Sequence, residues 1–274
     1  MGWVWHGLIN SSKERYLACN NSTYSEFQRK GITVEKQIGV LKYLRRYPVK
    51  SMKGEDLESV SLTKYGILGD RTYAFIDENA QERKFPWMTA RQAHEMLLFE
   101  PKFADESLSK VMVRTPEGTN FCIEDQGFEE FMENRFNRGL VLRHDTSGGC
   151  MDAKPLSLFG LSTVRALSDE TGIKLSHERF RANLYPEWDA EYDKPFFEDT
   201  LVGKRLKIGS KAKVRVVKKD SRCVIPTLDP MNGTSKLEIL ETIQKQHEGC
   251  AGVYAVVEAE GIVRPGDSIW IVDS

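Results

Sequence analysis

The amino-acid sequence predicts a mainly β protein of the mixed α+β class. From Ile38 onward, short apolar stretches alternate with turn residues, which is typical of a barrel or a sandwich. Only three segments have the apolar spacing of a helix. The 274 residues suffice for one or two domains with a substantial core. We expect a barrel-like N-terminal domain at 38–150 and a second barrel domain at 151–274, preceded by an extension of unassigned role at 1–37.

The expected strands of the first half follow one another at short intervals. The first ends at Pro48, and the second alternates apolar with polar residues so that Leu57, Val60 and Leu62 face inward. A third strand ends at the turn residues that begin with Asp77. In chain order, the strands of this half are IGVLKYLRRYPV, LESVSLT, RTYAFID, EMLLFEP, KVMVRTP and NFCIED.

The three expected helices have apolar residues at intervals of three and four. In the last of them, Leu237, Leu240 and Ile243 are expected to face the core, and glycines end the second and third helices. The helical segments are GFEEFMENRF, LSTVRALSDETG and KLEILETIQKQHEG. The chain then returns to strands, which we place at GKRLKIG, KAKVRVVKK, GVYAVVEA and DSIWIVDS. The glycine-rich stretch 146–154 is the expected boundary between the domains.

Composition and motifs exclude several classes of protein. The formal net charge is −1, from 39 basic and 40 acidic residues, so no overall positive field attracts nucleic acid. No run of about 18 apolar residues predicts a transmembrane segment, and residues 1–10 lack the pattern of a signal peptide. No phosphate-binding loop or dinucleotide fingerprint occurs, and the histidines stand apart from one another. We expect a cytoplasmic protein with local anion sites.

The cysteines indicate one thiol with a special role. Their number is odd and no CxxC pair occurs, which argues against a disulfide framework and against a recognisable zinc or iron–sulfur motif. Cys223 follows a predicted strand in a loop with two prolines, and Arg222 precedes it. Positive charge favours the thiolate, which binds soft metals. The alternative is a buried structural cysteine. The five cysteines are Cys19, Cys122, Cys150, Cys223 and Cys250.

Several polar residues at expected strand–loop junctions are candidate anion contacts. Arginine binds phosphate in a bidentate way, lysine acts as a point charge, and serine and asparagine add hydrogen bonds. Each of these charges is alternatively a solvated surface residue. Ser162 and Thr163 lie in the first turn of an expected helix, where exposed N–H groups bind anions or the hydroxyls simply cap the helix. The junction residues are Lys50, Ser51, Arg71, Arg179, Arg181 and Asn183.

Together these segments resemble the MOSC family with its N-terminal β-barrel domain, and within it the branch of mitochondrial amidoxime-reducing components and their bacterial counterparts. The combination of SRCVIPTLDPMNG with RFRANLY is the specific part of the resemblance. The segment TSGGCMDAKP and Met52 depart from that branch. The other matching stretches are YPVKSMKG, GILGDRTYAFID, MTARQ, PLSLFGLSTVRAL and GIVRPGDSIWIV, all in the order of the family.

The resemblance implies a molybdenum cofactor of the molybdopterin type, with Cys223 as the ligand to the metal. It also implies a molybdenum-dependent oxidoreductase that reduces the N–O bond of small N-hydroxylated substrates, supplied with electrons by a separate electron-transfer protein. The alternatives are a carrier of the cofactor or of sulfur that uses Cys223, and a structural β-module. The residues that would hold the cofactor are Lys50, Ser51, Arg71, Ser162, Thr163, Arg181, Asn183, Ser221 and Arg222.

Overall fold

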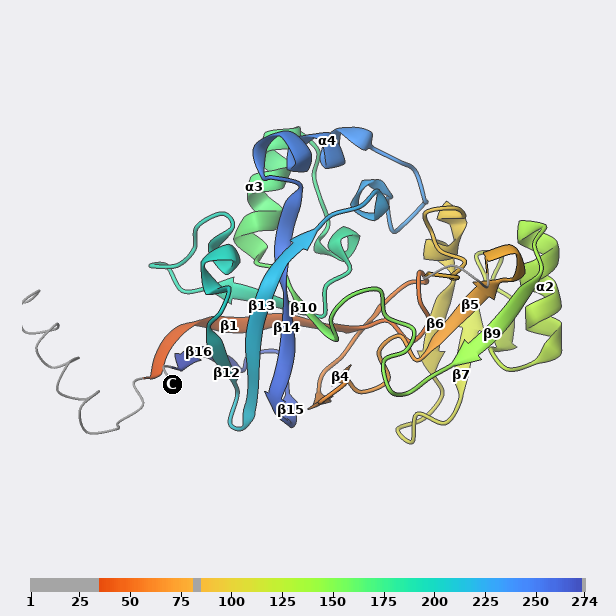
Figure 1. Cartoon of the computed structure of the whole chain (residues 1–274), viewed down its shortest axis with the longest axis horizontal. Helices are drawn as coiled ribbons and strands as arrows, with labels where there is room; N and C mark the ends of the chain where they lie inside the picture. Colours follow the sequence, from red (N-terminus) through yellow and green to blue (C-terminus); the bar gives the residue numbers. More distant parts are fainter. Residues whose placement is uncertain (1–34, 81–84, 273–274) are drawn as a thin grey trace, which may run out of the picture.

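The computed structural model describes residues 35–80 and 85–272, which form a barrel and a smaller lobe beside it (Figure 1). Most of the expected N-terminal extension, residues 1–34, lies outside the described residues. Residues 35–37, the end of the expected extension, instead belong to the first strand, β1 (Glu35–Arg46). They pair with the last strand, β16 (Ser268–Val272), so the tertiary pairing extends the strand beyond the apolar run seen in the sequence.

The barrel has seven strands and confirms the mainly β fold class. Its order is β11-β10-β14-β13-β12-β16-β1, and β1 pairs back onto β11 to close it. Buried side chains such as Leu41, Leu206 and Val253 fill its interior. Closure leaves no free sheet edge among these strands. The remaining strand bounds are β10 (Leu156–Leu158), β11 (Leu184–Trp188), β12 (Arg205–Ile208), β13 (Ala212–Ser221) and β14 (Cys250–Ala259).

The first part of the chain belongs to the barrel as much as the last part does. Ile38 and Leu44 of β1 lie in the barrel core, and Val60 and Leu62 of a short neighbouring strand join them. That strand pairs with a strand close to the C-terminus. Val60 and Leu62 are buried as the alternation predicted, and Leu57 packs against the same core. The short strands here are β2 (Glu55–Asp56), β3 (Val60–Thr63), β4 (Gly66–Ile67) and β15 (Gly261–Val263).

The smaller lobe surrounds a second apolar core, with Phe75, Phe99 and Phe128 among its fully buried members. One expected strand here was wrong, because EMLLFEP begins as a 3-10 helix, His94–Leu98. A short continuous apolar run does not distinguish a buried strand from a buried helical turn. The elements are β5 (Tyr73–Asp77), β6 (Glu100–Phe103), β7 (Val111–Arg114), β8 (Asn120–Cys122), β9 (Leu140–His144) and α2 (Gln126–Phe136).

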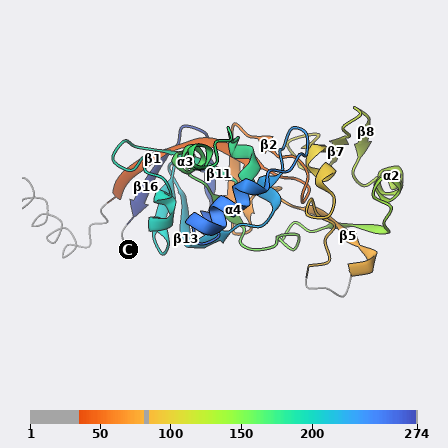
Figure 2. The same cartoon turned by 90° about the horizontal axis from the view of Figure 1, so that it is seen from above.

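Two further helices, α3 (Leu161–Thr171) and α4 (Leu237–Gln246), pack on each other beside the barrel (Figures 1 and 2). The inward face of α4 differs from our expectation, because Leu237 is 56% exposed and Ile239 is buried beside Ile243. Leu237 is the first residue of the helix and projects from its exposed end. No helix in the described ranges is both long and apolar enough to cross a membrane. Short 3-10 helices occupy Glu78–Ala80, His177–Phe180, Phe197–Leu201 and Ile225–Thr227.

Candidate functional site

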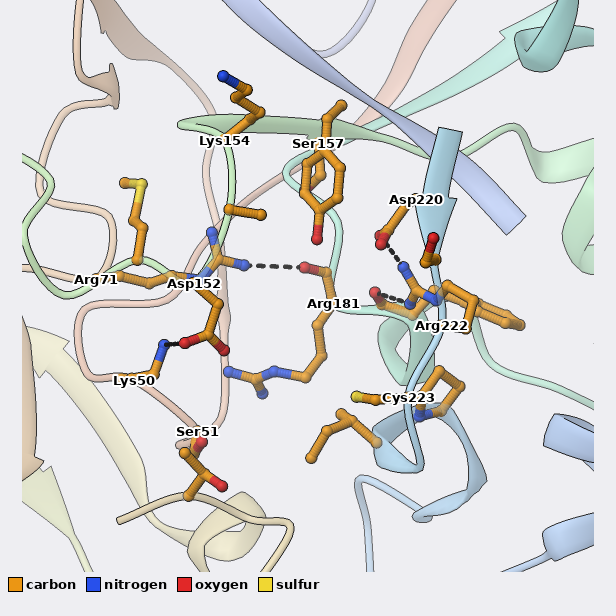
Figure 3. A pocket seen from close by; sticks show the side chains of 18 of the residues that line it. Lys50, Ser51, Arg71, Asp152, Lys154, Ser157, Arg181, Asp220, Arg222 and Cys223 are labelled. Carbon is orange, nitrogen blue, oxygen red and sulfur yellow. Dashed lines mark hydrogen bonds and ion pairs between the residues drawn. The ribbon is translucent and has the colours of Figure 1, made fainter. Parts of the chain in front are cut away.

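A cleft between the barrel and the smaller lobe gathers most of the predicted site residues. Its cavity volume is about 180 Å³, and it is open to solvent on one side. Six basic side chains and two acidic ones line it, so it is strongly positive in a chain whose net charge is −1. The predicted residues that line the cleft are Lys50, Ser51, Arg71, Arg181, Ser221, Arg222 and Cys223 (Figure 3).

Lys50 lies on the segment that leaves β1 for the smaller lobe. The side chain is 6% exposed, and its ammonium group donates to the Cys150 carbonyl at 3.0 Å and pairs with Asp152 at 2.9 Å. Burial lowers the pKa of Lys50, and Asp152 partly offsets this effect. The next residue, Ser51, has a φ of 66°, so the backbone turns sharply at the wall of the cleft.

Arg71 and Arg181 approach each other across the cleft, and their charges are balanced differently. Both have a left-handed backbone, with φ of 49° and 53°. Arg71 pairs with Asp70 at 2.6 Å and donates to the Arg181 carbonyl at 3.1 Å. The Arg181 guanidinium lies 4.4 Å from the centre of the Tyr47 ring and has no hydrogen bond or ion pair within residues 35–80 and 85–272. Burial lowers the pKa of Arg181 to about 10. Figure 3 shows this side chain directed into the cleft.

Cys223 lies just beyond β13, where the strand ends at Ser221. Its neighbour Arg222 is held firmly, because its guanidinium pairs with Asp220 and donates to the Phe180 carbonyl at 2.6 Å. The Arg222 amide also donates to the Gly249 carbonyl at 2.8 Å. These contacts fix the backbone on the N-terminal side of Cys223, whose thiol is free and half-buried. The loop therefore presents one anchored thiol to a cationic cleft.

Three predicted site residues do not line the cleft. Asn183 is fully buried behind it, where its side-chain carbonyl accepts from the Ser157 hydroxyl at 3.0 Å. Ser157 itself lines the cleft. The Ser162 hydroxyl donates to the Lys194 carbonyl, and Thr163 accepts from a backbone N–H. The structure thus uses both hydroxyls to hold the start of α3 against a neighbouring loop, away from the other predicted residues.

The cleft also contains residues that the sequence reasoning missed. Arg91 comes from the smaller lobe, Tyr254 from β14, and Asp152 and Lys154 from the connecting stretch 146–154. Arg91 lies in MTARQ, which shares in the family resemblance but carries no local pattern that indicates its role. Tyr254 is an isolated residue on a strand, so no pattern singles it out. Cys150 does not line the cleft, and burial raises the pKa of its thiol to about 11.

Charge and thiol chemistry together indicate what this cleft can bind. Arg181 is a partly buried cation without a counterion in the part of the chain that the structure describes, and such a charge is costly unless an anion binds to it. Cys223 offers the sulfur ligand that soft and high-valent metals use. The residues therefore fit a group that has both an anionic part and a metal that accepts a thiolate.

Comparison with known proteins identifies the family. Residues 38–152 match the MOSC N-terminal beta barrel domain, and residues 143–270 match the MOSC domain. The chain therefore belongs to the family of proteins that combine these two domains. The two matches overlap in 143–152, the stretch that connects the two halves, and its last two residues, Met151 and Asp152, line the cleft.

Relatives within this family cover most of the chain at low identity. Mitochondrial amidoxime-reducing component 1 of Mus musculus is 23% identical over 296 residues, which covers 86% of this chain and 83% of that protein. The Homo sapiens protein of the same name is 21% identical, with coverage of 86% and 84%. Among solved structures, the YUAD protein from Bacillus subtilis aligns over 88% of this chain and 99% of its own, with 14% identity and a TM-score of 0.45.

Proposed function

We propose that this protein binds a molybdenum cofactor of the pterin type in the cleft and reduces N-hydroxylated compounds with it. The observation that carries the proposal is that one cleft holds both the half-buried free thiol of Cys223 and the guanidinium of Arg181, which has no counterion among the described residues. A pterin cofactor needs both, because it combines a phosphate with a metal that accepts a thiolate. The names of the relatives, which refer to amidoxime reduction, support the reaction.

In this proposal the chain's own residues bind and orient the cofactor. Cys223 is the protein ligand to molybdenum. Arg181 takes the phosphate, because its guanidinium is available for two parallel hydrogen bonds. Arg71, which holds the Arg181 carbonyl, keeps that residue in place. Lys50, Ser51, Ser221 and Arg222 complete the walls. When bound, the cofactor supplies the two-electron chemistry, and the protein supplies position and charge.

The proposed reaction breaks one N–O bond. It consumes two electrons and two protons, leaves the N–H compound and releases the oxygen as water. Electrons must come from elsewhere, because the sequence has no dinucleotide fingerprint. We therefore propose a separate electron-transfer protein that docks at the open side of the cleft. The purified chain supplied with NADPH alone is expected to reduce no amidoxime, and a viologen reductant is expected to start turnover. Sustained turnover with NADPH alone would contradict this part of the proposal.

A carrier of the cofactor, or of sulfur on Cys223, is the second candidate. The half-buried position of the Cys223 thiol favours it, since a carrier needs a thiol that a partner protein can reach. The two candidates differ in turnover. A carrier releases its cargo to an acceptor and does not reduce an amidoxime repeatedly with an artificial reductant, whereas a reductase does so while keeping its molybdenum.

The test of the main proposal replaces Cys223 by serine in the full chain, expressed in a host that makes the cofactor. Cys223→Ser is expected to lose the metal-ligating thiolate, so molybdenum per chain and amidoxime turnover both fall to background while the circular dichroism spectrum is retained. The matched control is Cys150→Ser. That thiol lies outside the cleft lining, 3.8 Å from the Thr72 carbonyl, which a serine hydroxyl can also contact. Full molybdenum content and normal turnover in Cys223→Ser would refute the proposal.

A further inference from the structure

Arg91 is placed in the cleft by a short, well-fixed turn of the smaller lobe. The Thr89 hydroxyl donates to the Gln92 side chain at 2.5 Å, and the Gln92 amide donates back to the Thr89 carbonyl at 2.9 Å. Just before this turn, the Met88 amide bonds to Phe75 of β5. The backbone under Arg91 is therefore anchored to the sheet, and its long side chain reaches from one lobe toward the other.

At its far end, Arg91 shares the lining of the cleft with Asp152 and Cys223. Its guanidinium is 3.3 Å from one carboxylate oxygen of Asp152, and Cys223 lines the same cleft, where the two groups interact electrostatically. The other oxygen of Asp152 lies 2.9 Å from the ammonium group of Lys50. Lys50 is almost fully buried, whereas the Arg91 side chain is 42% exposed. Asp152 therefore pairs more closely with the buried Lys50, which leaves positive charge of Arg91 facing the open cleft.

The other three guanidinium groups of the cleft already have an ion-pair partner or a proposed ligand. Arg71 and Arg222 each have a carboxylate partner of their own, Asp70 and Asp220. Arg181 is assigned to the cofactor in the proposed function. Of the four arginines that line the cleft, Arg91 is thus the one that combines an exposed charge with an electrostatic interaction with Cys223.

We propose that Arg91 determines substrate specificity by charge, so that the preferred substrates are N-hydroxylated compounds with a negative charge near the N–O group, and cationic analogues are excluded. This inference rests on the proposed function for its substrate class. The selection of anions beside Cys223 is a property of the chain itself. The Asp152 carboxylate weakens this preference for anions, because it partly neutralises the charge of Arg91. For single charges in a partly exposed cleft, we expect changes of about three- to tenfold.

The first test measures the charge preference at Cys223 in the full chain prepared without cofactor. Iodoacetate is anionic and iodoacetamide is neutral, and both alkylate the same thiolate. The ratio of their rates at Cys223, followed by peptide mass spectrometry, reports local charge and is independent of the thiolate fraction. Arg91→Gln is expected to lower the iodoacetate-to-iodoacetamide ratio about three- to tenfold, and Asp152→Asn to raise it. The control Arg165→Gln, which removes an exposed arginine paired with Asp193 outside the cleft lining, is expected to leave the ratio unchanged.

The second test uses the loaded protein and three benzamidoximes that have a carboxylate, a carboxamide or an aminomethyl group at the same ring position. The wild-type chain is expected to prefer the carboxylate over the aminomethyl compound in kcat/KM, and Arg91→Gln to reduce that preference mainly through KM. If alkylation is charge-selective but none of the three compounds is turned over, the proposed reaction is contradicted, whereas the anion-selecting role of Arg91 is not. An alkylation ratio that is the same in wild type, Arg91→Gln and Asp152→Asn overturns the inference.

Discussion

Replacing Arg181 by methionine is expected to stabilise the cofactor-free protein and weaken cofactor binding. Burial lowers the pKa of Arg181 to about 10, and a depression of this size corresponds to about 3 kcal/mol against the charged folded state. Part of the side chain faces the open cleft, so we halve this value to about 1.5 kcal/mol. The lost cation–π contact with Tyr47, 4.4 Å from guanidinium to ring centre, costs about 0.5 kcal/mol. The net gain is about 1 kcal/mol, because methionine still packs on the ring.

The measurement compares thermal unfolding and molybdenum content. For a chain of this size, 1 kcal/mol raises Tm by about 2–4 °C. Loss of the hydrogen bonds to a phosphate, at about 1.5–3 kcal/mol, weakens cofactor binding by about one to two orders of magnitude. The control is Arg71→Met, which leaves the buried Asp70 carboxylate without its ion pair and is expected to destabilise the protein. If Arg181→Met destabilised the cofactor-free chain as Arg71→Met does, and kept its molybdenum, the reasoning would be wrong.

Two predictions concern the buried pair at the start of α3, in which the Gly160 amide donates to the Glu198 carboxylate. Burial raises the pKa of Glu198 from its ordinary 4.5 to about 7. Between these two pH values the Glu198 carboxyl is therefore protonated in the folded state and ionised in the unfolded state. The stability that this group contributes below pH 4.5 is therefore lost as the pH rises through 7, by up to about 3 kcal/mol. Urea titrations at pH 5 and pH 8 should show this loss in the wild type and not in Glu198→Gln; equal losses would contradict it. Gly160→Ala would place a methyl group 2.6 Å from both Glu198 Oε2 and Trp188 Nε1, so we expect a cost of about 1–3 kcal/mol in the same titration. Unchanged stability of Gly160→Ala would contradict this prediction and would mean that Glu198 and Trp188 can move aside.

The local pattern of the chain predicted most elements of the fold. Helical spacing located both ends of α2, α3 and α4 to within three residues, because one face of each helix must be apolar to pack. Alternation identified β3 and its buried residues Val60 and Leu62 for the same reason. Local pattern failed at residues 94–98, where a continuous apolar run fits a helical turn as well as a strand.

The sequence predicted some of the residues of the candidate site. Cys223 and Arg222 stand out because their chemistry is concentrated in one short loop, and the resemblance to the MOSC family added Lys50, Ser51, Arg71 and other residues to it. Ser162 and Thr163 could not be decided in this way, because a hydroxyl at a helix start fits an anion contact and a structural hydrogen bond equally well. Their partners, the Lys194 carbonyl and the Phe196 amide, lie more than thirty residues away in the chain.

The sequence by itself determined the mainly β class, the helices and the one loop that combines a thiol with an arginine. Each of these depends on side chains that are neighbours along the chain, where periodicity and local chemistry are visible. Only the tertiary structure decided that β1 closes the barrel and that Arg91 of the other lobe lines the same cleft as Cys223. It also decided that Arg71 and Arg222 have carboxylate partners, whereas Arg181 has none among residues 35–80 and 85–272. Those facts depend on contacts between distant segments, and whether a charge is paired or exposed is set by which segments meet.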